Sequence, residues 1–333
     1  MSHPIIKDVA AASGTSIGTV SNVLNHPERV SPPTQEKVFQ AIERLGYIRN
    51  DAARQLRAGH SSTLGLALPA STNPFFAEVA RGAETAADAL DLRLIIGTTG
   101  ESGEREARYL ELFEQVRVRG VLLSSLAFQP QRLNSIRQRG TPVVLVDQED
   151  TAGVIPAVTV DDDAGGYLAT RHLIDRGSKH ILFVGSRSGG QQVMLRFQGA
   201  SRAVEEHPGV RLSRADVAEM TVDAGRDFGH EMLGEKAGMG VDGIFAGNDL
   251  IALGMMQTFI LVLKQPLPDG VRLVGYDDID FAQSSILPLT SVRQPAFELG
   301  RASVNLLAEY FDDPSQPVKT LKFQPELVVR QTS

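Results

Sequence analysis

The sequence predicts an all-α N-terminal unit followed by a larger α/β body. Residues 5–25 are typical of two short helices joined by a tight turn, and strand and helix patterns alternate from Ser62 onward. A chain of 333 residues, 42% of them hydrophobic, is long enough for two or three folding units with large cores. It contains no cysteine, which excludes a disulfide framework and thiolate metal sites.

The N-terminal stretch has the pattern of a helix-turn-helix. Gly14 can adopt the left-handed conformation that ends a helix, and the Ser16 hydroxyl can cap a second helix by accepting an amide proton of its first turn. Apolar residues recur at helical spacing around this turn; they are Ile6, Val9, Ala10, Val20, Val23 and Leu24. The second helix of such a motif has the right size for the major groove of DNA.

Two further helical segments follow. Ser31 and Pro32 are typical of a helix start and Gly46 of a helix end. The apolar face of this third helix consists of Val38, Ala41, Ile42 and Leu45. Residues 50–59 are alanine-rich but fewer than the ~12–15 residues that an isolated helix needs in water. We therefore expect this segment to become helical only when something packs against it.

The remaining chain alternates buried strands with helices, which predicts a parallel sheet with helices on both faces. The expected strands are residues 63–69, 92–98, 120–125, 141–147, 181–186, 241–247 and 271–278, and the first two expected helices are residues 73–90 and 103–119. Polar residues follow several strands; they are Asn73, Asp147, Asn248, Asp249, Asp277 and Asp278. Because ligands of such sheets bind outside the carboxyl ends of the strands, we expect a binding site there.

Several short runs of the N-terminal region form a known family pattern. They are Lys7–Ala10, Gly14, Thr19–Ser21, Val23–Asn25, Val30–Ser31, Glu36–Val38 and Leu45–Tyr47. This pattern resembles the LacI/GalR (lactose-repressor) family of bacterial transcription regulators, and the resemblance continues to the C-terminus. It implies a helix-turn-helix DNA-binding headpiece at residues 1–49, a hinge helix at 50–60, and an effector-binding and dimerisation domain at 61–333.

The resemblance also implies the architecture of the third region. Two Rossmann-like α/β lobes, as in type I periplasmic binding proteins, are expected to enclose the ligand between them. The chain should cross from lobe to lobe near residues 155, 290 and 320.

The resemblance assigns DNA contacts to the headpiece and hinge. Ile17, Gly18 and Asn22 occupy the positions that select the operator, and the family usually has Arg where this chain has Asn22. Asn prefers adenine, so we expect an operator that differs from the commonest family half-site. Further expected contacts are Ser16, Thr19, Ser31, Thr34, Ala53 and Leu56.

The roles of these further residues differ. The four hydroxyl side chains can bind phosphate or serve as plain helix caps, and both roles remain open. Leu56 matches the family's leucine wedge in the minor groove. Ile5 stands where the family usually has a capping Thr, which puts one phosphate contact in doubt.

The resemblance assigns ligand contacts to the cleft. They are Asn73, Phe75, Phe76, Asp147, Arg196, Asn248, Asp277 and Gln294. Carboxylates accept paired hydroxyl protons and a guanidinium donates to sugar oxygens. The alternative for the charged residues is a structural salt bridge, which we prefer for Asp278, and at least one of the two Phe rings should pack in the core. Ala224 and Val160 lie near positions where many relatives place aromatic residues, which favours a carbohydrate over a purine.

Enzyme motifs do not fit the sequence context. Gly14–Gly18 matches G-x-S-x-G, but an alanine-rich helix precedes it where a nucleophile elbow needs a strand. The seven His are scattered, and no G-x-x-x-x-G-K-[ST] phosphate loop occurs. We therefore expect no catalytic residues, no metal and no cofactor.

Charge and hydropathy agree with an intracellular DNA-binding protein. Residues 1–60 carry seven Lys and Arg against five acidic residues, net +2, whereas the remainder carries −9. The sequence shows no secretory signal and no apolar run long enough to span a membrane, so we expect a cytoplasmic protein. The chain lacks the extra leucine heptads that some family members use for tetramers, which favours a homodimer.

These observations predict a repressor of carbohydrate-utilisation genes. Its expected partners are near-palindromic double-stranded operator DNA, a small-molecule effector of the sugar class and a second copy of the chain, with no membrane. The alternatives are a solute-binding protein or a sugar-acting enzyme on the same two lobes.

Overall fold

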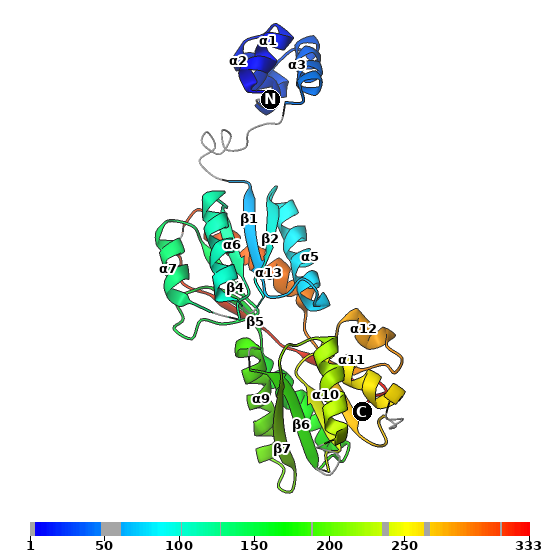
Figure 1. The fold of residues 1–333 in the computed structure, drawn as a ribbon. Helices are drawn as coiled ribbons and strands as arrows, with labels where there is room; N and C mark the ends of the chain where they lie inside the picture. Colours follow the sequence, from blue (N-terminus) through cyan, green and yellow to red (C-terminus); the bar gives the residue numbers. More distant parts are fainter. Residues whose placement is uncertain are drawn as a thin grey trace. The chain divides into compact units, whose positions relative to one another are not determined.

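The computed structural model describes residues 4–47, 61–100, 102–126, 128–187, 189–234, 240–262, 267–313 and 315–333. The chain divides into two compact units, Met1–His60 and Ser61–Ser333, and each is described by itself (Figure 1). The expected fold class, a helical N-terminal unit and a two-lobe α/β body, is confirmed. The expected hinge helix, with Ala53 and Leu56, lies outside the described residues.

The first unit packs three helices around one small core. They are α1 (Ile6–Ser13), α2 (Ile17–Asn25) and α3 (Pro32–Leu45), with a 3₁₀ turn η1 (Pro27–Arg29) before α3. The core consists of Val9, Ala10, Val20, Val23, Val38 and Ala41. Gly14 ends α1 at φ 67°, and the Ser16 Oγ accepts from the Thr19 amide at 3.0 Å, as expected.

The start of α1 replaces the missing hydroxyl cap in part. The Asp8 carboxylate accepts a hydrogen bond from the Ile5 amide at 2.8 Å. This is the returning half of a capping box, which satisfies one amide that the helix itself leaves unpaired. The Ile5 departure therefore does not break the helix start.

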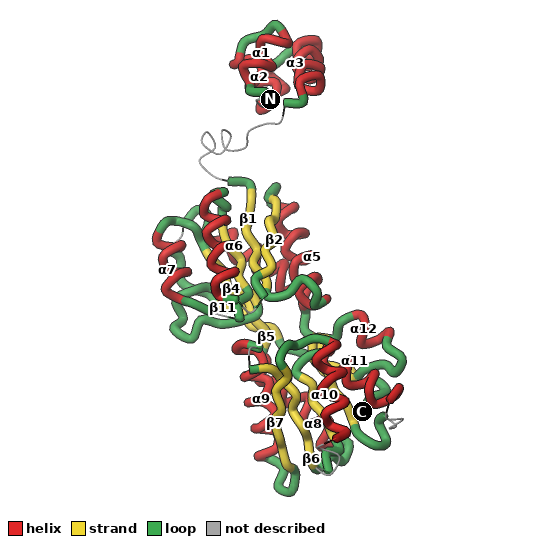
Figure 2. Tube along the Cα trace, viewed as in Figure 1, coloured by secondary structure: helices red, strands yellow, loops and turns green. Residues whose placement is uncertain are grey.

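The second unit contains two lobes, each a six-stranded sheet with helices on both faces (Figure 2). Lobe 1 has the all-parallel order β11-β5-β4-β3-β1-β2. Its strands are β1 (Thr63–Leu68), β2 (Arg93–Thr98), β3 (Gly120–Leu123), β4 (Val143–Val146), β5 (Ala157–Val160) and β11 (Thr320–Phe323). Its helices are α5 (Pro74–Ala89), α6 (Gly103–Gln115), α7 (Pro130–Gln138) and α13 (Ala296–Glu309).

Lobe 2 repeats this layout with the order β12-β10-β9-β8-β6-β7, and β12 runs antiparallel to β10. Its strands are β6 (His180–Ser186), β7 (Arg211–Val217), β8 (Gly243–Ala246), β9 (Arg272–Asp277), β10 (Thr290–Arg293) and β12 (Glu326–Val328). Its helices are α8 (Asp162–Asp175), α9 (Gly190–Glu205), α10 (Val222–Gly234), α11 (Asp249–Gln257) and α12 (Asp280–Ser284), and a π-helical segment η2 (Thr258–Val262) follows α11.

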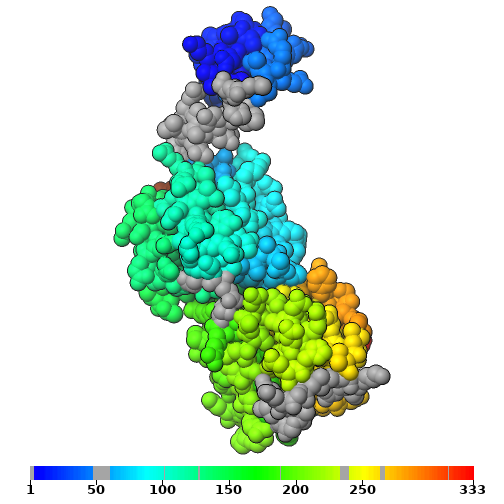
Figure 3. Space-filling view, in the orientation of Figure 1, coloured from blue at the N-terminus to red at the C-terminus, as the bar shows by residue number. Residues whose placement is uncertain are grey.

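The chain passes between the lobes three times. These passages lie between β5 and α8 at residue 161, between β10 and α13 at residues 294–295, and between β11 and β12 at residues 324–325. Each falls a few residues beyond the position expected from the sequence. The two lobes meet at a junction that can be followed in the space-filling view (Figure 3).

One expected element ends early. The helix predicted for residues 103–119 stops at Gln115, because Arg117 adopts a left-handed conformation (φ 55°) and Val118 turns into the core. A left-handed residue interrupts the helical hydrogen-bond ladder, and the chain then enters β3.

A close helix crossing between α8 and α9 lies in lobe 2. A Cβ added at Gly166 of α8 would lie 2.0 Å from the Arg196 carbonyl oxygen of α9, and one added at Gly199 of α9 would lie 1.9 Å from the Asp163 carbonyl oxygen. These glycines let the two backbones touch, and the crossing fixes where Arg196 leaves α9.

Candidate functional site

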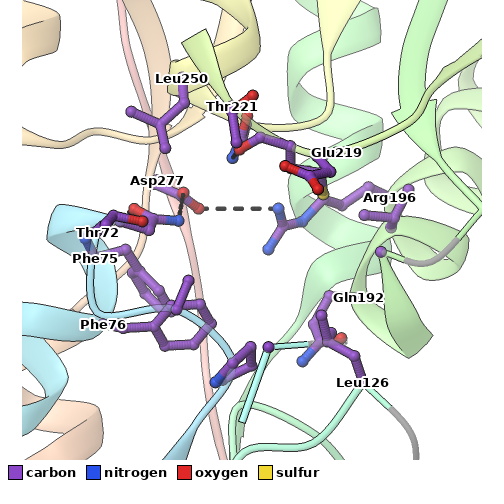
Figure 4. A pocket seen from close by; sticks show the side chains of 18 of the residues that line it. Thr72, Phe75, Phe76, Leu126, Gln192, Arg196, Glu219, Thr221, Leu250 and Asp277 are labelled. Atoms are coloured by element: carbon purple, nitrogen blue, oxygen red, sulfur yellow. Dashed lines mark hydrogen bonds and ion pairs between the residues drawn. The ribbon is translucent and has the colours of Figure 1, made fainter. Parts of the chain in front are cut away.

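A cavity of about 390 Å³ lies between the lobes, at the carboxyl ends of strands from both sheets (Figure 4). Six of the eight expected ligand residues line it; they are Asn73, Phe75, Phe76, Arg196, Asn248 and Asp277. The volume falls within the range of small-molecule sites.

Asp277 is the buried one of two carboxylates that line this cavity, the other being the exposed Glu219. Asp277 ends β9 at φ 107° and accepts hydrogen bonds from Gln294 Nε2 (2.8 Å) and, across the lobes, from Asn73 Nδ2 (3.4 Å). The Arg196 guanidinium lies 3.8 Å from it. Burial raises the pKa of Asp277 to about 6, although Arg196 and the two amides favour the charged form.

Arg196 is held rigidly opposite Asp277. Its Nε donates to Asp162 at 2.7 Å, its Nη1 donates to the Gly247 carbonyl at 2.7 Å, and its guanidinium stacks 3.7 Å from the centroid of the Tyr276 ring. Burial works against the charge and lowers the Arg196 pKa, but the carboxylate of Asp162 and further acidic groups outweigh it, so the pKa is raised overall. The guanidinium is thus a fixed, permanently charged donor.

Two asparagines place helix N-termini at the cavity. Asn73 caps α5 and Asn248 caps α11, each accepting a backbone amide proton at 3.0 Å, from Phe75 and Ile251 respectively. Their side-chain NH₂ groups have other partners. That of Asn73 donates to Asp277, and that of Asn248 donates to the Met220 carbonyl at 3.2 Å. The capping role explains why an Asn stands directly before each of these helices, in the loop that follows β1 or β8.

Phe75 and Phe76 form the apolar wall. Their rings meet edge to face, with centroids 5.1 Å apart. Phe75 is also part of the buried core of lobe 1, which confirms the expectation that at least one ring packs there. Among the described residues, no other aromatic side chain lines the cavity.

Two of the expected ligand residues do not line the cavity. Gln294 stands behind Asp277 and donates to it, whereas Asp147 lies behind Gln192, whose Nε2 donates to the Asp147 carbonyl at 2.5 Å. Burial, and then the repulsion of Asp162, raises the pKa of Asp147 well above its ordinary value. Both residues form hydrogen bonds with side chains that line the cavity but do not line it themselves.

The neighbouring acidic residues have structural partners. Asp278 accepts from Arg330 at 2.6 Å and from Arg293 at 2.7 Å, as expected for a structural salt bridge. Asp249, fully buried, accepts from the Ser291 hydroxyl at 2.6 Å and the Ile279 amide at 2.9 Å, and burial raises its pKa well above the ordinary value.

The sequence interpretation missed several lining residues. They include Thr72, Arg105, Leu126, Gln192, Glu219 and Thr221. Gln192 could have been found, because it lies four residues before Arg196 on one helix and so shares its face. Thr221, rather than Ala224, reaches the cavity from this segment, and Val160 is buried in β5.

The start of α2 is the candidate DNA surface of the first unit. Ile17, Gly18 and Asn22 are exposed, and Ile17 keeps 45% of its surface in solvent although it is apolar. Hydroxyl pairs stand beside two helix starts, Ser16 with Thr19 and Ser31 with Thr34, each 2.9 Å apart. Ser16 caps α2; such a cap does not preclude a phosphate contact.

The described residues contain no group of three or more His, Asp or Glu side chains arranged to hold a metal ion. No helix among them is long and apolar enough to cross a membrane.

Comparison with known proteins identifies both units. The family model of "Bacterial regulatory proteins, lacI family" matches residues 5–50, and that of "Periplasmic binding proteins and sugar binding domain of LacI family" matches residues 61–322. The chain is 32% identical to the ribose operon repressor of Halalkalibacterium halodurans, over 98% of this chain and 96% of that protein. It is 30% identical to the repressor PurR of Photobacterium profundum, over 98% of both chains.

A solved structure resembles the second unit. A LacI family transcriptional regulator from Enterococcus faecium, crystallised with bound ribose, superposes with a TM-score of 0.74 at 26% identity, covering 81% of this chain and 98% of that one. These relatives are transcriptional regulators that match the chain through its headpiece, its two lobes or both. The chain therefore belongs to the LacI family of bacterial regulatory proteins.

Proposed function

We propose that this LacI-family regulator is a repressor of carbohydrate-utilisation genes whose effector is a monosaccharide bound between the lobes. The observation that supports this most directly is the opposed pair of Asp277 and Arg196 in a cavity with one aromatic wall.

The cavity chemistry suits a ligand rich in hydroxyl groups. The Asp277 carboxylate can accept hydroxyl protons, and the Arg196 guanidinium can donate to ring and hydroxyl oxygens. Phe75 and Phe76 can pack against the C–H face of a sugar ring. A purine would lack a second aromatic surface to stack on, because Leu126, Gln192 and Val193 are among the non-aromatic residues that complete the lining. One relative is named a ribose operon repressor and one similar solved structure contains bound ribose, which is consistent with this choice.

We propose that α2 reads the operator with Ile17, Gly18 and Asn22. An exposed isoleucine at a helix start can pack on a thymine methyl, and Asn22 can pair with an adenine edge. Ser16, Thr19, Ser31 and Thr34 are proposed phosphate donors, and Ala53 and Leu56 are proposed contacts of the hinge segment.

Apolar surface on the second unit supports a homodimer. Ile95 and Ile96 are exposed on the edge strand β2, and Leu261, Phe281 and Ile286 are exposed on lobe 2, with Ile286 75% accessible. Phe281 and Ile286 line one surface hollow together, and contiguous exposed apolar surface is typical of protein interfaces. We propose a second copy of the chain as the occupant, so that two headpieces contact two operator halves.

Repression would then depend on how the ligand positions the lobes. A ligand that binds one lobe arrangement better shifts the dimer interface and the hinge segments, and a coupling of about 1–3 kcal/mol changes operator affinity by roughly 5–150-fold. We place this activity in the cytoplasm and propose no catalysis, metal or cofactor.

A thermal-shift screen against pentoses, hexoses, sugar phosphates and purines tests the proposal. A ligand at 100 times its dissociation constant should stabilise the protein by roughly 2.7 kcal/mol. We expect a neutral sugar to give the largest shift and to change binding to an operator selected from random DNA. A selective purine response would overturn the sugar assignment. If the protein enriched no sequence from random DNA, the proposal that it is a sequence-specific regulator would be overturned.

A further inference from the structure

A side-chain amide joins the two lobes just outside the cavity. Gln191, the second residue of α9 in lobe 2, accepts a hydrogen bond from the Glu149 amide of lobe 1 at 2.9 Å. Its Nε2 donates to the carbonyl of the same Glu149 at 3.3 Å. One planar amide thus satisfies both backbone groups of a residue in the opposite lobe, as a neighbouring strand would.

The next residue on α9, Gln192, also forms hydrogen bonds with lobe 1, but it lines the cavity. Gln192 donates to the Asp147 carbonyl at 2.5 Å and to its carboxylate at 3.3 Å, and it lines the cavity, whereas Gln191 does not. The buried Gln192 Oε1 has no hydrogen-bond partner among the residues that the structure describes. A ligand hydroxyl could supply that donor, so Gln192 belongs to the ligand surface and Gln191 lies outside it.

The loop that receives Gln191 is anchored to lobe 1. The Lys322 ammonium of β11 forms an ion pair with the Glu149 carboxylate at 2.7 Å, and Asp150 accepts from the amides of Ala152 and Val154 at 3.0 Å. A bond from Gln191 to this loop therefore connects the body of lobe 2 to the body of lobe 1.

We propose that Gln191 is a latch that stabilises the closed lobes and thereby raises effector affinity without contacting the effector. This inference rests on the proposed function, because it assigns a regulatory role at the same cleft. The other cross-lobe bonds described above, from Asn73 to Asp277 and from Gln192 to Asp147, involve residues that line the cavity and will change with each ligand. The latch contributes equally whatever ligand is bound.

That difference predicts a specific result. When the lobes separate, both Gln191 bonds are exchanged for bonds to water, so removing them weakens closure by roughly tenfold. Gln191→Met should therefore raise the dissociation constants of two epimeric sugars by the same factor, up to about ten, and leave their ratio unchanged. Gln192→Met should change the ratio, because it alters the ligand surface.

Gln131→Met is the matched control. Gln131 is also the second residue of a helix, α7, and it is exposed on lobe 1. The variant should bind both sugars as the unmodified protein does. Gln191→Glu keeps the size of the side chain but replaces the donor by a charged acceptor that faces the Glu149 carbonyl, so it should weaken closure at least as much as Gln191→Met.

A second measurement tests the latch without any sugar. Because the chain has no cysteine, Glu111→Cys on α6 and Glu205→Cys on α9 can carry one spin label in each lobe. Double electron–electron resonance measures the distance between the two labels. The distance distribution should become longer and broader when Gln191→Met is added to this labelled protein, and it should stay unchanged when Gln131→Met is added.

The outcomes separate the two proposals. Unchanged distances with Gln191→Met, or an affinity loss confined to one epimer, would overturn the latch. A lengthened distance in a protein that binds no sugar would keep the latch and refute the effector assignment.

Discussion

The carboxyl group of Asp277 is expected to govern ligand binding at the scale of single residues. Asp277→Asn keeps the shape but removes the charge that accepts hydroxyl protons, so we expect at least 100-fold weaker sugar binding and no effector response. At pH 8 the Asp277→Asn protein should be at least as stable to unfolding as the unmodified protein. The rise of the Asp277 pKa from 3.8 to about 6 corresponds to roughly 3 kcal/mol of unfavourable energy in the ionised folded protein. Calorimetric titration and thermal unfolding of both proteins check this, and retained affinity would place the ligand elsewhere.

The same pKa predicts a pH dependence with opposite signs for stability and binding. Between pH 4 and 6 folded Asp277 holds a proton that the unfolded chain has lost, so its contribution to stability falls as pH rises through this window. Sugar binding needs the ionised carboxylate, so affinity should rise over the same window.

Affinity at pH 5 should therefore be about tenfold lower than at pH 7. Isothermal titration at several pH values measures this, with Asp277→Asn as the control that lacks the slope. An affinity independent of pH would mean that binding does not change the protonation of Asp277, which would contradict a binding mode that needs its ionised carboxylate.

At the scale of elements, α2 offers a matched pair of asparagines. Asn22 is exposed, whereas Asn25 at the end of the same helix donates to the Ser21 carbonyl at 2.8 Å. Asn22→Ala should cost about 1–3 kcal/mol of operator affinity and relax the preference at one base pair. Asn25→Ala should leave that preference intact. Binding measured against operators mutated at each position distinguishes the two; equal base preference for both variants would contradict the assignment.

The crossing of α8 and α9 sets the position of Arg196. Gly166→Ala would bring a methyl group to 2.0 Å from the Arg196 carbonyl oxygen, so the helices must move apart. We expect about 1–3 kcal/mol lower stability together with weaker ligand binding. Arg171→Ala, on the exposed face of α8, should have little effect, because its ion pair with Asp175 is exposed. Chemical denaturation and titration test both variants, and a stable Gly166→Ala protein with full affinity would refute this role.

At the scale of the whole molecule, operator binding is expected to depend on dimerisation. Phe281→Glu places a charge on the exposed apolar surface of lobe 2, and it should shift the protein toward monomers and weaken operator binding strongly at nanomolar concentration. Met194→Glu makes the same kind of change on α9, an exposed site outside the proposed interface, and should leave the dimer unchanged. Sedimentation velocity measures the assembly; a dimer that survives Phe281→Glu would exclude this surface.

Local patterns were sufficient to predict the three headpiece helices and the alternation of strands and helices. Gly14 and Gly46 end the helices that precede them, and Ser16 caps the helix that follows it. The buried strands are runs of apolar residues, so neighbouring residues in the sequence are enough to predict these elements. Asn73 and Asn248, in the loops after β1 and β8, and Asp277, at the end of β9, were predictable for the same reason, since parallel strands place their carboxyl ends at one edge.

The sequence by itself thus determined the fold class, the family and the residue types at the cleft. Only the tertiary structure decided which of them face the cavity. Asn73 meets Asp277 across 204 residues of chain, Gln191 reaches Glu149 across 42, and Asp147 and Gln294 prove to be supports. The bonds across the cleft depend on how two lobes close on each other, a packing of distant surfaces that leaves no periodic signal in the chain.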